Sequence, residues 1–338
     1  MHTTVTLNEK TSYAVSAIRV FATLLIFLCH AVQMFDSALL QMSGQVFNVG
    51  VPLFMMISGF LFAVKGKPAS YRSWFGSRLL RILTPYYLFL LFLFLVYVAR
   101  FGWQSVIPEK WIFYVIPLQG FTQNYINGAE HLWFITDILL CYLLTPFLHV
   151  IQEKISKRQK LWLPAVFLLY AAVLLLSSYL LPAIVSTTIV TVFSYMLGFL
   201  FIKALLSRRY IVFIIMLLVS PALRLAANLF LDGTPLYDRF IAPVTHQLLA
   251  VSLFCLLFMA VSRWYGPLLR IGKAVRSLDS VSYEIYLVHY MFIIGPLAVT
   301  AFQLSILNFF ILVLLTAAAA VVLHVLSGSI LKRLRKRP

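Results

Sequence analysis

Long runs of apolar residues, separated by short polar and basic stretches, dominate this chain. A run of about 20 such residues is the length that a helix needs to cross the hydrocarbon core of a bilayer. The pattern therefore predicts an all-α polytopic membrane protein with ten transmembrane helices. The expected spans are 14–35, 48–64, 82–100, 132–151, 161–182, 184–204, 209–231, 241–262, 281–299 and 304–331.

The sequence predicts a single membrane domain over residues 1–338. Its helices occupy about 14–331, and a basic tail follows at 332–338. The first apolar run is too long for a signal peptide and no small-residue cleavage site follows it, so we expect it to be retained as a helix. The longest segment between spans is the loop at about 101–131, which is rich in aromatic residues. Such a loop suits either the membrane interface or the face of a sugar ring.

Charge supports the membrane assignment and orients it. The 338 residues are 62% hydrophobic and only 11% charged, against about 25% charged in soluble proteins. If the N-terminus is cytoplasmic, the outer loops and their flanks hold only four of the 27 Lys and Arg residues, namely Arg100, Lys110, Arg224 and Arg239. This bias follows the positive-inside rule and predicts that both termini are cytoplasmic. The net charge of +17 then points to anionic lipid and not to nucleic acid.

Arg19 and His30 form the most informative pair. Eleven positions are close to three helical turns, so the two side chains share a face and lie about 16 Å apart along the axis. The surrounding segment is almost wholly apolar. An ionisable group at membrane depth is costly unless it faces a cavity or a partner, so the pair suggests a polar groove. The alternative is that Arg19 extends to the inner surface and His30 bonds a neighbouring helix.

Two further arginines lie at the inner end of the third expected span. Arg78 and Arg81 are three residues apart and share a helix face. Two adjacent guanidinium groups can bind phosphate oxygens bidentately, although ordinary positive-inside anchors have the same composition. Asp137 and Glu284 are carboxylates within or beside apolar segments. Each is expected either to pair with another polar group or to line a pathway for a substrate or ion.

Three aromatic or imidazole side chains are candidates for contact with a substrate. His131 and Trp133 stand at the outer end of the fourth expected span, and His289 lies near the middle of the ninth. The alternatives are a solvated helix cap for His131 and an interfacial belt residue for Trp133. The cysteines Cys29, Cys141 and Cys255 all lie in apolar runs and form no CxxC pattern, so neither a disulfide framework nor a metal site is expected.

Taken in order along the chain, these motifs resemble acyltransferase family 3, the bacterial inner-membrane O-acyltransferases of surface polysaccharides. The resemblance covers residues 14 to about 330. The chain departs from many members of the family at 51–52, where Val-Pro replaces a string that carries an acidic residue. It also differs from those members that carry a fused hydrolase-like domain, because no such domain is evident. The motifs are Arg19 with His30, the run at 51–61, Arg78 with Arg81 and 85–87, 131–134, and 282–289.

The resemblance implies transfer of a short acyl group, by expectation acetyl, from cytoplasmic acetyl-CoA to a hydroxyl of a saccharide or glycolipid. It also implies polysaccharide-biosynthesis proteins as partners. It implies a multi-pass protein of the bacterial cytoplasmic membrane. A transporter or flippase for polysaccharide precursors, or a non-catalytic membrane subunit, remains the alternative. The expected roles are general base for His30, orientation of its imidazole by Glu284 or Asp137, donor binding for Arg19, Arg78 and Arg81, and acceptor binding for His131, Trp133 and His289.

Overall fold

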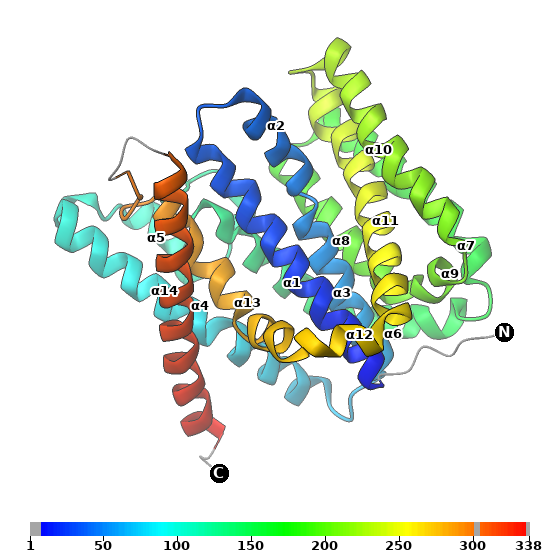
Figure 1. Cartoon of the computed structure of the whole chain (residues 1–338), viewed down its shortest axis with the longest axis horizontal. Coiled ribbons are helices and arrows are strands. Elements are labelled where there is room, and N and C mark those ends of the chain that lie inside the picture. Colours follow the sequence, from blue (N-terminus) through cyan, green and yellow to red (C-terminus); the bar gives the residue numbers. More distant parts are fainter. Residues whose placement is uncertain (1–7, 301–304, 336–338) are drawn as a thin grey trace. The chain divides into compact units, whose positions relative to one another are not determined.

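The computed structural model describes residues 8–300 and 305–335 (Figure 1). The structure is 86% helix, and the described residues include no strand, which confirms the all-α class. Residue 304 of the tenth expected span and residues 336–338 of the expected tail lie outside that part. The main helices are α1 (Glu9–Ala31), α2 (Ala38–Phe47), α3 (Gly50–Lys65), α4 (Tyr71–Phe101), α5 (Pro108–Val115), α6 (Trp133–Ile155), α7 (Gln159–Leu180), α8 (Ala183–Leu200), α9 (Ile202–Leu206), α10 (Tyr210–Leu231), α11 (Ala242–Arg263), α12 (Tyr265–Leu268), α13 (Gly272–Ile293) and α14 (Ser305–Arg335).

Eight helical segments among the described residues are long and apolar enough to cross a membrane. They include α1, α4, α7, α10 and α14, together with segments built around α3, α6 and α11. The sixth expected span is mostly helical and the ninth is helical as far as Ile293, but neither meets this standard. Helix α8 is a shorter apolar helix, and α13 begins earlier than expected and so includes Lys273, Arg276 and Asp279.

The chain forms two compact units. The first comprises residues 1–25, 48–69 and 140–279, and the second comprises 26–47, 70–139 and 280–338. Helices α1, α6 and α13 each contribute residues to both units. The two units are described separately below.

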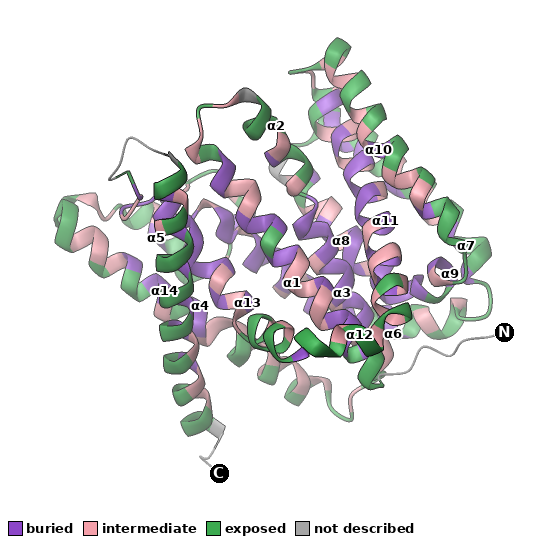
Figure 2. Ribbon diagram, viewed as in Figure 1, coloured by how far each residue is buried: buried purple, intermediate pink, exposed green. Residues whose placement is uncertain are grey.

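In the first unit, helices α3 and α8 pack closely against each other (Figure 1). Two glycines make this approach possible. A β-carbon at Gly59 would lie 2.1 Å from the carbonyl oxygen of Tyr195, and one at Gly198 would lie 2.0 Å from the carbonyl oxygen of Met56. Any larger residue would separate the backbones, so the glycines set the interhelical distance. Helix α3 is largely buried, as Figure 2 shows.

In the second unit, α14 packs against α4. Hydrogen bonds hold the 101–131 loop against α4 and against α6, where the Gly120 N–H donates to the Thr136 hydroxyl at 3.0 Å. The Tyr86 hydroxyl of α4 donates to the Tyr114 carbonyl (2.6 Å), and that of Tyr97 donates to the Asn127 carbonyl (2.7 Å). The Tyr114 hydroxyl accepts from the Ile126 N–H at 3.1 Å. Burial raises the pKa of Tyr114 above its usual range, so its hydroxyl remains neutral and continues to serve as a hydrogen-bonding group.

Candidate active site

Three histidines from distant parts of the chain meet in the second unit. His30 lies in the last turn of α1, His131 in the short 3₁₀ turn before α6 (Glu130–Leu132), and His289 in α13. Nδ1 of His30 is 2.8 Å from Nε2 of His289, which is hydrogen-bond distance. The His131 ring lies 5.0 Å from that of His289 and 6.3 Å from that of His30. His30 is half-buried, whereas His131 and His289 are buried.

Two tyrosines of α13 enclose this histidine cluster (His30, His131 and His289). The Tyr290 ring meets the His30 ring edge to face at 4.6 Å and lies 5.0 Å from the His131 ring. The Tyr286 ring lies 5.0 Å from the His131 ring, and its hydroxyl donates to the His131 carbonyl. These contacts restrict the rotation of each imidazole, so the polar nitrogens hold fixed directions.

His131 is the least satisfied member of the cluster. Its side chain is only 4% exposed, and neither ring nitrogen has a hydrogen-bond partner among the described residues. A neutral imidazole carries one N–H donor and one acceptor, and burying such groups unpaired is unfavourable. The solvated-cap alternative for His131 is therefore wrong. An unpaired donor and acceptor beside His30 are suited to bind the polar atoms of a ligand.

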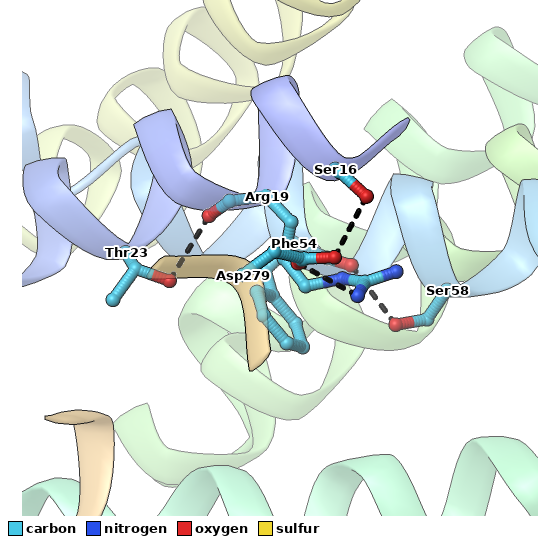
Figure 3. A network of polar contacts seen from close by, with 6 residues as sticks. All are labelled: Ser16, Arg19, Thr23, Phe54, Ser58 and Asp279. Atoms are coloured by element: carbon cyan, nitrogen blue, oxygen red, sulfur yellow. Dashed lines mark hydrogen bonds and ion pairs between the residues drawn. The ribbon is translucent and has the colours of Figure 1, made fainter. Parts of the chain in front are cut away.

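Arg19 has a carboxylate partner that the sequence did not indicate. In the first unit, Nη1 of Arg19 donates to Oδ1 of Asp279 at 2.8 Å, and the Ser16 hydroxyl donates to Oδ2 at 2.7 Å (Figure 3). The pair is partly buried, with 24% and 15% of the two side chains exposed. Figure 3 also shows the Thr23 hydroxyl donating to the Arg19 carbonyl at 3.0 Å. The ion pair offsets the cost of placing a guanidinium in an apolar helix.

The two candidate carboxylates occupy different surroundings. Oε1 of Glu284 contacts Nδ1 of His324 on α14 at 3.0 Å. Asp137 is fully buried in α6. The hydrogen-bond partner of His30, among the described residues, is another histidine and not a carboxylate.

The remaining candidates lie on α4 and at the start of α6. Arg78 is half-buried and Arg81 is exposed, one turn further along α4. Trp133 is half-buried, and its ring lies 6.4 Å from that of Phe134. Among the described residues, no group of three or more His, Cys, Asp or Glu side chains could hold a metal ion.

Comparison with known proteins identifies the kind of chemistry. A family model described as an acyltransferase domain matches residues 12–325, nearly the whole chain. This protein belongs to acyltransferase family 3. No curated protein and no solved structure matches it. As a family 3 member with several apolar membrane-length helices, it is a multi-pass membrane acyltransferase.

Several residues of the acyltransferase emerge only from the structure. Asp279 lies two residues before the ninth expected span, so the span did not predict its contact with Arg19. Tyr286 lies in the 282–289 motif, but the sequence assigned no role to it or to Tyr290. One signal was available for them, because Tyr286, His289 and Tyr290 recur at spacings of three and four and therefore lie on one helix face. His30 does bond a neighbouring helix, as the alternative for this residue expected, but the sequence did not single out His289 as its partner.

Proposed function

We propose that this protein is an O-acyltransferase that moves an acetyl or other short acyl group from cytoplasmic acyl-CoA to a saccharide hydroxyl. The observation that carries the proposal is His30. It is a half-buried imidazole near the end of an apolar helix, with one nitrogen held by His289 and the other without a hydrogen-bond partner among the described residues. A general base needs such a free nitrogen within reach of the hydroxyl proton.

The proposed reaction balances without a metal or a redox partner. Nε2 of His30 takes the proton of the acceptor hydroxyl as the oxygen attacks the thioester carbonyl carbon. The tetrahedral intermediate then collapses, and its carbon–sulfur bond breaks. The coenzyme A thiolate takes the proton back from His30 Nε2, leaving an ester, free coenzyme A and neutral histidine. General base catalysis of this kind contributes about 10²–10⁴-fold to a rate.

We assign the donor to the basic residues of α1 and α4. The phosphates of acyl-CoA are strong hydrogen-bond acceptors, and the guanidinium groups of Arg19, Arg78 and Arg81 are suited to bind them. The rise of a helix separates Arg19 from His30 by about 16 Å along α1, a distance that the pantetheine arm would have to cover. Arg19 would then share its guanidinium between Asp279 and the donor.

We assign the acceptor to the outer end of α6. The unpaired imidazole nitrogens of His131 offer a donor and an acceptor to a sugar hydroxyl or to the reacting carbonyl oxygen. Trp133 offers an aromatic face to a sugar ring, and Asp137 and Glu284 remain candidates for orienting the site through the residues they contact. The acceptor is a surface or lipid-linked saccharide, reached from the outer side of a bacterial cytoplasmic membrane.

The proposed topology has ten spans with both termini in the cytoplasm. The eight candidate spans and the two further helices α8 and α13 are compatible with this count. The strong excess of Lys and Arg in alternate loops supports the orientation.

Replacement of His30 tests the proposal. We expect His30→Ala to reduce transfer of labelled acetyl from acetyl-CoA to surface glycans in membranes by about 10²-fold or more. Acetyl-CoA should still raise the melting temperature of the purified variant, because the donor site is intact. A matched control is His149→Ala, a buried histidine of the first unit outside the histidine cluster.

Two outcomes would contradict the proposal. Normal transfer by His30→Ala would remove this residue from the mechanism. Absence of any stabilisation of the wild-type protein by acetyl-CoA would favour a transporter or a non-catalytic subunit, because neither needs the donor.

A further inference from the structure

We propose that His289 is a positioning residue that fixes the tautomer of His30, so that Nδ1 of His30 carries the proton and Nε2 is the basic nitrogen. The proposal deepens the function proposed above and rests on it. It gives His289 a role different from the acceptor binding expected from the sequence.

The first step of the argument is the anchoring of His289 within its own helix. Its Nδ1 lies 2.8 Å from the Tyr286 carbonyl oxygen and 3.2 Å from that of Ile285. A carbonyl oxygen only accepts hydrogen bonds, so Nδ1 of His289 must carry a hydrogen. The opposite tautomer would place a nitrogen lone pair against two oxygens in a site where His289 is fully buried.

The second step follows from the chemistry of a neutral imidazole. Once Nδ1 of His289 is protonated, Nε2 has only a lone pair and must accept. Nδ1 of His30, 2.8 Å away, is then the donor. With its proton on Nδ1, His30 presents the lone pair of Nε2, which is the form that a general base requires.

The third step concerns charge during the reaction. When Nε2 of His30 takes the acceptor's proton, the ring becomes an imidazolium with donors at both nitrogens. Nε2 of His289 continues to accept from Nδ1 of His30, so no hydrogen bond has to be rebuilt. The Tyr290 ring, 4.6 Å from that of His30, and the His289 ring, whose plane lies 26° from that of His30 with the ring centres 5.0 Å apart, hold the imidazole in place. A neutral histidine therefore takes the orienting position that a carboxylate occupies in many histidine bases.

Two amide variants of His289 provide a matched test. Glutamine places its amide at the distance of Nε2, so His289→Gln retains an oxygen that can accept from His30. Asparagine is one carbon shorter and places its amide near the position of Nδ1, so His289→Asn retains a polar group but does not reach His30. We expect kcat of His289→Asn to fall about 10²-fold or more, with the KM for acetyl-CoA unchanged, and His289→Gln to remain within about tenfold of wild type.

A spectroscopic measurement tests the tautomer without reference to activity. The ¹⁵N shifts of labelled histidine in the purified full-length protein distinguish protonated from unprotonated ring nitrogens, and His30→Gln assigns the His30 signals by their loss. We expect wild-type His30 to be the Nδ1–H tautomer. It should remain so in His289→Gln and should change to the commoner Nε2–H form in His289→Asn.

The two measurements separate failure of this inference from failure of the proposed function. If wild-type His30 is the Nε2–H tautomer, or if His289→Asn keeps both the tautomer and wild-type kcat, the inference is overturned whatever reaction the protein catalyses. If the tautomers behave as expected but His30→Ala retains full transfer, the positioning is real and the assignment of His30 as the base is wrong.

Discussion

Arg19 and His30, both in the first apolar helix, each have a polar partner on α13. In the first unit Arg19 is paired with Asp279, and in the second unit His30 contacts His289. The partners differ in a way that fits the two proposed roles. A carboxylate compensates the permanent charge of Arg19, whereas a neutral imidazole leaves His30 free to gain and lose a proton.

Removal of one member of the Arg19–Asp279 pair should destabilise the protein. Asp279→Leu or Arg19→Leu leaves an uncompensated charge that is mostly buried, at a cost of about 1–3 kcal/mol in the free energy of unfolding. The double variant replaces both charges with apolar groups and should recover most of that stability. Thermal unfolding in detergent measures the effect.

The same variants separate support of the fold from donor binding. If Arg19 contacts acyl-CoA, the KM for acetyl-CoA should rise in both Arg19→Leu and the double variant, even though the double variant is stable. Wild-type donor affinity in a stable double variant would restrict Arg19 to its ion pair with Asp279.

At the scale of elements, the contact between α3 and α8 depends on two glycines. A β-carbon at Gly198 or Gly59 would lie about 2 Å from a backbone oxygen of the other helix, far inside van der Waals contact. We expect Gly198→Ala and Gly59→Ala each to lower the free energy of unfolding by about 1–3 kcal/mol, because the helices must separate. The melting temperature in detergent should fall accordingly.

Gly328→Ala is the matched control for those variants. Gly328 is also helical, and a β-carbon there meets no atom within 4 Å. Alanine is favoured over glycine in a helix by about 1 kcal/mol, so this variant should be as stable as wild type or more so. Equal stability of Gly198→Ala and Gly328→Ala would show that the α3–α8 approach is not tight.

The helices could be predicted from sequence because each depends mainly on its own composition. The apolar runs containing Leu93, Leu174 and Leu218 all form long helices, as expected. The start of helix α13 was harder to predict, because its first half is charged and only its second half has the apolar composition of a membrane span. The hydrogen bonds that tie Tyr86 and Tyr97 to the 101–131 loop had no sequence signal.

The site was predictable only in part, for a related reason. His30, His131 and His289 each stood out as polar residues in or beside apolar segments. Their meeting point depends on how α1, α13 and the turn before α6 pack, and spacing within one helix does not determine packing between helices. The sequence therefore favoured carboxylates as the groups that orient His30, whereas in the structure its hydrogen-bond partner is His289.

For the whole molecule, the proposed mechanism requires a fixed orientation across the membrane, because it takes the donor from the cytoplasm and the acceptor from the outer side. The charge distribution predicts that the 101–131 loop is external and that the segment between α6 and α7 is cytoplasmic. Each segment contains an exposed position that can be replaced by cysteine, namely Gln123 in the loop and Ser156 between the helices.

Cysteine labelling checks that orientation. In a background with Cys29, Cys141 and Cys255 replaced by alanine, a membrane-impermeant maleimide added to intact spheroplasts should label Gln123→Cys and spare Ser156→Cys. Permeabilisation should make Ser156→Cys react to the same extent, which controls for its accessibility. The reverse pattern would put Arg78 and Arg81 on the side where acyl-CoA is absent, and the acyl-CoA-dependent mechanism would then fail.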